Sequence, residues 1–248
     1  MRSDVVRLFQ TLPHACGYYA DRLSQNLVID PSSPQLDRLY EIALLRGYRR
    51  AGGHVYIPRC QACRACVACR IPVADFAADR GQRRCLRRNE DLAIEVVPAR
   101  YSEERYELYR RYLQWRHPDG GMDDAQPEDF SRFLYTHWSP TRFIEFRKQG
   151  RLLAVAVTDF CETGLSAVYT FYDPDIRERG IGTFAILQQI EIARQRGLDH
   201  VYLGFWIKGH PKMDYKKRFV PIEILRNGEW VVAEADPDPS DNTAATLL

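Results

Sequence analysis

The hydrophobic pattern is most regular in the second half of the chain. Three consecutive segments are interpreted as strands, in which successive side chains face opposite sides: residues 142–147, 152–159 and 165–172. Gly150 and Gly164 stand in the two connecting turns. Residues 183–196 then show helical spacing up to Gly197, and residues 200–205 form another apolar segment. The pattern predicts three antiparallel strands, a helix and a further strand.

Helical spacing also occurs earlier in the chain. Residues 36–46 carry an apolar stripe, and Ser102 is suited to cap a helix with aromatic residues on one face. Pro127 is suited to the first position of another helix, whose apolar face would run to Trp138. Short strands are predicted at 55–57 and around two later apolar positions, Ile222 and Val231.

These elements suggest a division along the sequence. We expect a Cys- and Arg-rich domain at 1–98, a larger domain at 99–233 and a disordered acidic tail at 234–248, which is rich in Pro, Asp, Ser and Thr. A length of 248 residues suits one large or two small domains.

Composition narrows the class of protein. An apolar share of 45% is that of an ordinary globular protein, and no run approaches the roughly 18 apolar residues of a membrane span. The first residues show no apolar core of a secretory signal. We therefore expect a cytoplasmic protein, in which clustered cysteines more often bind metal or react than form disulfides.

The net charge of +2 conceals an uneven distribution. Residues 46–88 contain eleven Arg and two Asp, a net charge of +9, whereas residues 234–248 contain four acidic and no basic residues. Such a density of Arg suits a polyanion such as RNA; a solvated basic face is the alternative.

The cysteines at 60, 63 and 66 have the spacing of metal ligands, and a distant cysteine could complete the set. The candidate ligands are Cys16, Cys60, Cys63 and Cys66, for zinc or an iron–sulfur cluster. The alternative is a group of small buried residues without metal.

An Arg-x-x-Gly-x-Gly motif, with Arg177, Gly180 and Gly182, precedes the helix at 183–196. Glycines before a helix let backbone N–H groups approach an anion. The order of three strands, this motif, a helix and a strand resembles the core of the Gcn5-related N-acyltransferases. This resemblance implies an α+β fold, with a mixed, mostly antiparallel sheet and flanking helices, beside the smaller Cys/Arg-rich N-terminal domain.

Longer motifs resemble a more specific family, the aminoacyl-tRNA–protein transferases. The matching segments are 47–50 (GYRR), 53–56 (GHVY), 63–66 (CRAC), 70–73 (RIPV), 153–159 (LAVAVTD), 165–174 (LSAVYTFYDP), 202–207 (YLGFWI) and 212–216 (KMDYK). The compact length is similar to that of the bacterial aspartate/glutamate leucyltransferases. The chain departs from the eukaryotic pattern at Tyr19 and Ala65, where further cysteines stand in that branch.

The resemblance implies transfer of leucine from leucyl-tRNA to the α-amine of proteins that begin with Asp or Glu, which marks them for degradation. The aminoacyl ester is already activated, so the chemistry requires no cofactor. Asp159 is the candidate base or amine-orienting group, and Tyr169 the candidate hydrogen-bond donor.

Binding roles are expected for the cations. The acceptor's carboxylate would meet one or more of Arg49, Arg50, His54, Lys212 and Lys216. The tRNA would meet Arg80, Arg83, Arg84, Arg87, Arg88, Arg177, Gly180 and Gly182. Two other functions stay open from the residues: a coenzyme A-dependent N-acetyltransferase, and a zinc-containing RNA-binding protein without catalysis.

Overall fold

The computed structural model describes residues 6–116 and 126–233, and the chain forms two compact units. The first contains residues up to Phe76 and from Tyr202 onward, and the second contains Ala77–Val201. The expected division at residue 98 treats the domains as consecutive, whereas the first unit is built from both ends of the chain. The expected acidic tail at 234–248 lies outside the described residues.

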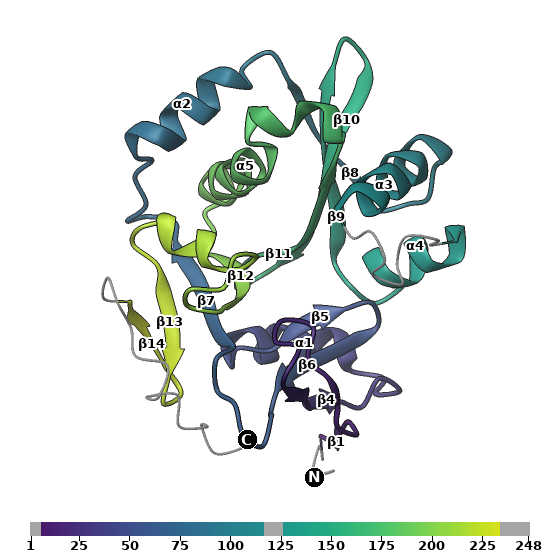
Figure 1. Ribbon diagram of the computed structural model, residues 1–248, viewed down its shortest axis with the longest axis vertical. Coiled ribbons are helices and arrows are strands. Elements are labelled where there is room, and N and C mark those ends of the chain that lie inside the picture. Colours follow the sequence, from purple (N-terminus) through teal and green to yellow (C-terminus); the bar gives the residue numbers. More distant parts are fainter. Residues whose placement is uncertain (1–5, 117–125, 234–248) are drawn as a thin grey trace. The chain divides into compact units, whose positions relative to one another are not determined.

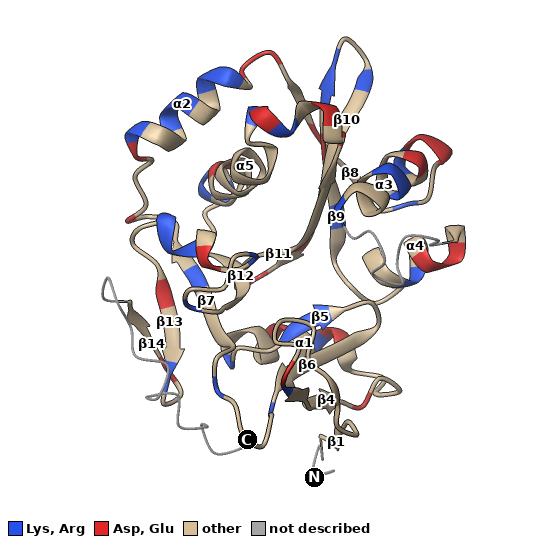
Figure 2. Cartoon of the chain, viewed as in Figure 1, with Lys and Arg blue, Asp and Glu red and all other residues tan. Residues whose placement is uncertain are grey.

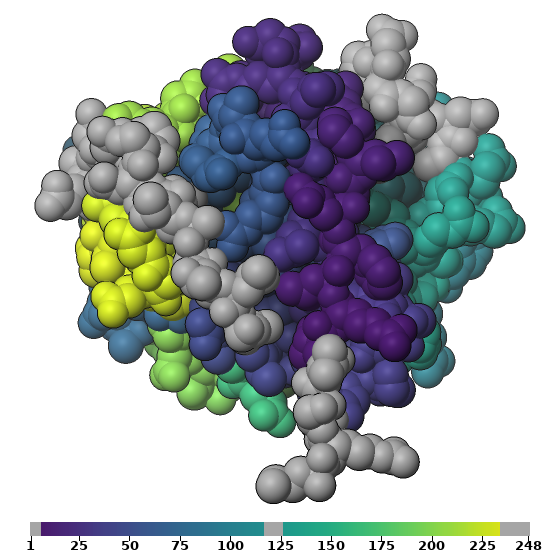
Figure 3. Space-filling model, turned by 90° about the horizontal axis from the view of Figure 1, so that it is seen from below, coloured from purple at the N-terminus to yellow at the C-terminus, as the bar shows by residue number. Residues whose placement is uncertain are grey.

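The first unit is rich in short strands (Figure 1). The first part of the chain supplies β1 (Leu8–Gln10), β2 (His14–Ala15), β3 (Leu23–Ser24), β4 (Asn26–Ile29), α1 (Leu36–Leu45), β5 (Arg49–Ala51), β6 (His54–Pro58) and β7 (Val67–Pro72). The last part supplies β12 (His200–Trp206), from Tyr202 onward, then η2 (Asp214–Arg218), β13 (Glu223–Arg226) and β14 (Glu229–Val232). A four-stranded sheet has the order β1-β4-β6-β5, and β2 pairs with β3. In Figure 3 the N-terminal segment, in purple, lies at the surface.

Strand pairing explains why the end of the chain joins the first unit. β13 pairs antiparallel with β7, with Glu223 opposite Arg70 and Ile224 opposite Cys69. Arg70 and Glu223 also form a half-buried ion pair at 2.6 Å. After α1, Gly47 has φ +80°, and an added Cβ would lie 2.7 Å from Leu225. Only glycine fits this crossing of the two chain segments.

The second unit consists of a sheet between helices (Figure 1). Its elements are α2 (Arg80–Arg88), β8 (Ala93–Pro98), α3 (Glu103–Arg116), α4 (Pro127–Leu134), β9 (Thr141–Lys148), β10 (Arg151–Cys161), β11 (Gly164–Tyr172), η1 (Pro174–Arg179) and α5 (Ile181–Gln195). The strands are neighbours in the order β11-β10-β9-β8, and each of these pairs is antiparallel.

Alternation along β10 divides the core of this unit into two layers. Val155 and Val157 pack in a cluster with residues of α3 and α4, whereas Ala154 and Ala156 pack with Phe184 and other residues of α5. Successive side chains of a strand point to opposite faces, so one apolar strand supplies both layers.

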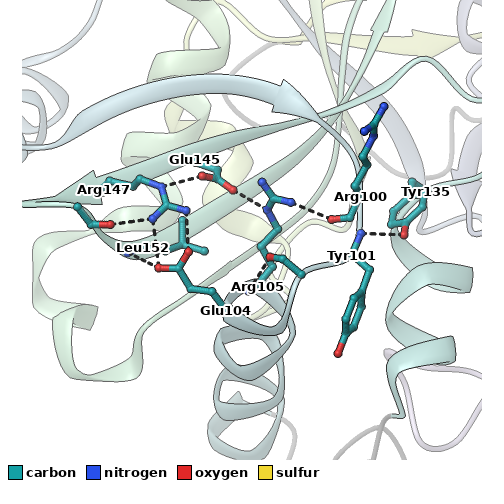
Figure 4. Close-up of polar contacts among 10 residues, drawn as sticks. Arg100, Tyr101, Glu104, Arg105, Tyr135, Glu145, Arg147 and Leu152 are labelled. Atoms are coloured by element: carbon teal, nitrogen blue, oxygen red, sulfur yellow. Dashed lines mark hydrogen bonds and ion pairs between the residues drawn. The ribbon is translucent and has the colours of Figure 1, made fainter.

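Buried charges tie α3 to the sheet (Figure 4). Glu145 on β9 is 1% exposed and accepts hydrogen bonds from Nε of Arg105, at 2.6 Å, and Nε of Arg147, at 2.8 Å. Arg147 also pairs with Glu104 at 2.7 Å. A buried carboxylate is tolerated because both of its oxygens are paired with cations.

The predicted α+β class, with a mostly antiparallel sheet and flanking helices, is confirmed, as is the order of strands, motif and helix from β9 to α5. One predicted boundary needs correction: α4 ends at Leu134, because Tyr135 is extended, so Trp138 lies beyond it. The sequence analysis also missed β7, α2 and β8, although Asp79 and Gln82 form a capping box at the start of the Arg-rich helix α2. No helix among the described residues is long and apolar enough to cross a membrane.

Candidate functional site

Asp159 lies near the end of β10 in the second unit and is completely buried. Its Oδ1 accepts a 2.6 Å hydrogen bond from Oγ1 of Thr141, which lies opposite it on β9. The hydroxyls of Thr141 and Ser139 are a further 2.6 Å apart. The carboxylate is therefore held in a fixed orientation by a short chain of hydroxyl groups.

Tyr169 lies on the adjacent strand β11, opposite Val157. The register shifts at this point, because Thr158 pairs with Ala167, so that Val168 has no partner on β10. Such a bulge re-aims neighbouring side chains and is common at functional sites. Asp159 and Tyr169 therefore lie on neighbouring strands, with Asp159 opposite Ser166 and Tyr169 opposite Val157.

The Tyr169 side chain packs in an aromatic cluster with Phe133, at a ring-centroid distance of 5.4 Å, and with Tyr109 and Tyr112. Its hydroxyl is buried and has no hydrogen-bond partner among the described residues. Burial raises the pKa of Tyr169, as do Tyr112 and Tyr109. The phenol is therefore neutral at physiological pH and keeps an unused donor.

The five predicted RNA-binding arginines of residues 80–88 lie on one helix, α2, and all are exposed (Figure 2). Among the described residues none of them forms an ion pair. Two donate hydrogen bonds to carbonyl groups: Arg83 to Ala78 and Arg88 to Glu178, each at 2.5 Å. The positive charge of α2 is thus available to an anion.

The Gly-containing motif lies against the C-terminal end of α2. Asn89, which is completely buried, donates to the carbonyl of Arg179 at 2.9 Å, and the Cys85 thiol donates to the carbonyl of Gly180 at 3.5 Å. Arg179 Nε donates back to Asn89 Oδ1 at 3.0 Å. Gly182 has open space where a Cβ would stand, and Arg177 is exposed. The two sets of expected RNA contacts therefore belong to one surface of the second unit.

Two of the five expected acceptor-binding residues come together in the first unit. Arg49 is 8% exposed and donates to the carbonyl of Tyr202 at 3.2 Å, and an added Cβ on Gly204 would meet its guanidinium at 2.9 Å. Lys216 is 4% exposed and donates to the carbonyl of Phe205. The pKa of Lys216 is lowered to about 8, mainly by burial; Cys69 opposes this shift, and the neighbouring Arg49 contributes to it.

The other three expected acceptor-binding residues do not join Arg49 and Lys216. Arg50 follows Arg49 on β5, and neighbouring strand residues face opposite sides. Arg50 instead donates a hydrogen bond to the carbonyl of Gly52 at 3.0 Å. His54 on β6 and Lys212 are exposed.

The four candidate metal ligands all line one cavity of the first unit. Arg22 donates to the sulfur of Cys63 at 3.2 Å, and the Cys60 thiol faces the carbonyl of Gln25 at 3.8 Å. Burial raises the pKa of Cys66 to about 12, and the nearby thiols add to this effect. No group of three His, Cys, Asp or Glu side chains in the described ranges is arranged to hold an ion. A bound metal would itself deprotonate coordinating thiols. Metal binding by Cys16, Cys60, Cys63 and Cys66 therefore stays a prediction.

Two family models cover most of the chain. The model described as arginine-tRNA-protein transferase, N terminus, matches residues 14–84, and the corresponding C-terminus model matches residues 104–226. The chain belongs to the aminoacyl-tRNA–protein transferase family.

Curated relatives show which members of the transferase family this chain is similar to. A protein of Stenotrophomonas maltophilia named aspartate/glutamate leucyltransferase is 55% identical, with 96% of this chain and 97% of that protein covered. Proteins of the same name from Xanthomonas campestris and Xylella fastidiosa are 54% and 48% identical, each with 92% of both chains covered. Among solved structures, an N-acetyltransferase region of a fungal β-N-acetylglucosaminidase is similar at a TM-score of 0.39 and 12% identity, over 78% of this chain and 22% of that one.

The transferase contains functional candidates that sequence reasoning missed. Four arginines line the same cavity as the thiols: Arg22, Arg46, Arg59 and Arg64. Arg59 and Arg64 are interleaved with the cysteine run, and this could have indicated an anion site. Arg22 and Arg46 could not be assigned from spacing, because only the folded first unit brings them to the cavity.

Proposed function

We propose that this chain transfers leucine from leucyl-tRNA to the α-amine of proteins beginning with Asp or Glu, and thereby creates a signal for protein degradation. The observation that carries the proposal is family membership, with 55% identity over 96% of the chain to a protein named for this activity. An aminoacyl-tRNA substrate places the activity in the cytoplasm.

The reaction is an aminolysis of an ester. The neutral α-amine attacks the leucyl carbonyl carbon, a C–N bond forms, and the ester C–O bond breaks to release the ribose hydroxyl. The amine loses a proton and the ribose oxygen gains one. The enzyme must therefore orient the amine, handle one proton and stabilise the oxyanion.

The second unit supplies groups for these tasks. We assign Asp159 to orient the amine or accept its proton, because its buried carboxylate has a defined orientation from Thr141. We assign Tyr169 as a donor to the oxyanion, because its hydroxyl is unpaired among the described residues. The bulge at Val168 lies between the two paired segments and supports this location.

The RNA is assigned to α2 and the adjacent motif. Arg80, Arg84 and Arg87 offer exposed charge without ion pairs among the described residues. The buried Asn89 fixes the motif against α2 through two hydrogen bonds, so that both contribute to one phosphate-binding surface. No step of this reaction uses a metal, and metal analysis of anaerobically purified protein tests whether the thiols hold one.

One assay distinguishes the three candidate functions. The purified protein is incubated with radiolabelled leucyl-tRNA and a peptide that begins with Asp. We expect label to appear in the peptide as an added N-terminal leucine. Acetylation of the peptide from acetyl-CoA without leucine transfer would instead support the acetyltransferase, and tRNA binding without either product would support a binding protein.

A further inference from the structure

The cavity that the thiols line has a strongly cationic wall. It has a volume of about 190 Å³. One water needs about 10–15 Å³, so the cavity has room for a group of several atoms. Its lining includes Arg22, Arg46, Arg59 and Arg64, and includes no Asp or Glu of the described chain.

Two of these arginines, Arg46 and Arg64, have no carboxylate partner among the described residues. Arg64 donates to two carbonyls, those of Cys60 and Cys63, and Arg46 forms no ion pair within the described ranges. Arg22 is stacked on the Tyr19 ring at 4.0 Å, and its contact with Asp21, at 3.9 Å, is to a carboxylate that is 82% exposed. An ion pair of this kind neutralises little charge.

Further positive charge lies directly behind the wall. Tyr56 and Phe205 line the cavity. Tyr56 is paired in register with Arg49, and the carbonyl of Phe205 accepts the hydrogen bond of Lys216. Lys216 has no carboxylate partner in the described part of the chain. Burying the Lys216 ammonium without an anion is unfavourable, and an anionic ligand nearby would relieve this cost.

We propose that this cavity binds the side-chain carboxylate of the acceptor protein's first residue, with Arg46 and Arg64 as its direct partners, and that it distinguishes Asp and Glu from Asn and Gln. The proposal rests on the proposed function for the identity of the ligand. A concave site with aromatic and thiol walls suits one side chain, whereas RNA phosphates suit the exposed arginines of α2. Arg49 and Lys216 act from behind as positioning residues that strengthen the positive potential.

The test measures binding without tRNA. Fluorescent peptides that differ only in a first residue of Asp or Asn are titrated by anisotropy into the wild-type protein, the double variant Arg46→Gln with Arg64→Gln, and the control Arg38→Gln. Arg38 is exposed on α1 and lies outside the cavity lining. We expect the wild type and the control to prefer Asp by about tenfold or more, because charge-assisted bonds are lost with Asn. The double variant should bind both peptides equally weakly.

Two results would overturn this assignment. One is that the wild type binds both peptides with equal affinity but still transfers leucine to the Asp peptide. The proposed function would then stand without this binding site. The other result is that a tRNA acceptor-stem RNA displaces the Asp peptide and that this RNA binds the double variant more weakly than the wild type. That outcome would show that the cavity binds RNA. Absence of leucine transfer together with a retained preference for Asp would instead contradict only the proposed function. Thermal unfolding of the double variant checks that its loss of binding is not a loss of fold.

Discussion

Thr141 donates a 2.6 Å hydrogen bond to the completely buried carboxylate of Asp159 on the adjacent strand. The hydroxyl orients a carboxylate that sequence reasoning assigned to the reaction. We expect Asp159→Asn to lower the single-turnover rate of leucine transfer by about 10²–10⁴, the range for loss of a positioned acid–base group. The dissociation constant for tRNA should change by less than about twofold, since RNA contacts are assigned to α2. Unchanged transfer by this variant would remove Asp159 from the mechanism.

Tyr169→Phe tests whether the Tyr169 hydroxyl serves leucine transfer or only affects the stability of the fold. The change removes a buried hydroxyl that has no partner in the described ranges, so the free energy of unfolding should rise by about 1 kcal/mol in urea titrations. Leucine transfer should fall at the same time if the hydroxyl stabilises the oxyanion. A more stable variant with full activity would assign Tyr169 to packing alone.

Arg84→Glu tests the RNA surface. Arg84 is exposed on α2, in the middle of an Arg-rich helix. We expect weaker tRNA binding and a shallower dependence of log Kd on log salt, with the slope reduced by about 1 because one phosphate contact is lost. The control Arg38→Glu has the same charge change on α1 of the first unit. Equal effects of both substitutions would indicate a response to net charge rather than a contact on α2.

Lys216→Met tests the buried cation by its pH dependence. The pKa of Lys216 is lowered from 10.5 to about 8 in the folded protein, so between these values the unfolded chain binds more protons. Below about pH 8 the folded protein bears the full cost of burying the charge. As the pH rises from about 8 toward 10.5, the free energy of unfolding of the wild type therefore increases. We expect Lys216→Met to remove this gain.

The measurement is urea unfolding of both proteins at pH 7 and at pH 9.5. The stability of the wild type relative to the variant should rise between these values, with an upper limit of about 2 kcal/mol. A difference that is independent of pH would show that the ammonium is not destabilised by burial. Burial raises the pKa of Cys69 and the Lys216 charge lowers it, so both proteins carry Cys69→Ala to keep this thiol out of the difference.

Several elements were readable because their signals are local. The alternation in β10 predicted a strand, and the position of Pro127 predicted the start of α4. The helix α2 also had a local signal, the capping box of Asp79 and Gln82, which the dense run of Arg obscured. Strand β7 was missed because the preceding cysteines suggested only a loop.

The sequence by itself determined the α+β class and the family, since periodicity and contiguous motifs specify these features, and it proposed Asp159 and the arginines of α2 as site residues. Tertiary structure alone decided which cations meet. Pairing of β7 with β13 returns the end of the chain to the first unit, and there Arg49 and Lys216 both contact carbonyls of β12. The same folding places Arg22, Arg46 and Arg64 around one cavity. Residues distant in sequence have no shared period, so their meeting depends on topology and on the burial that holds it.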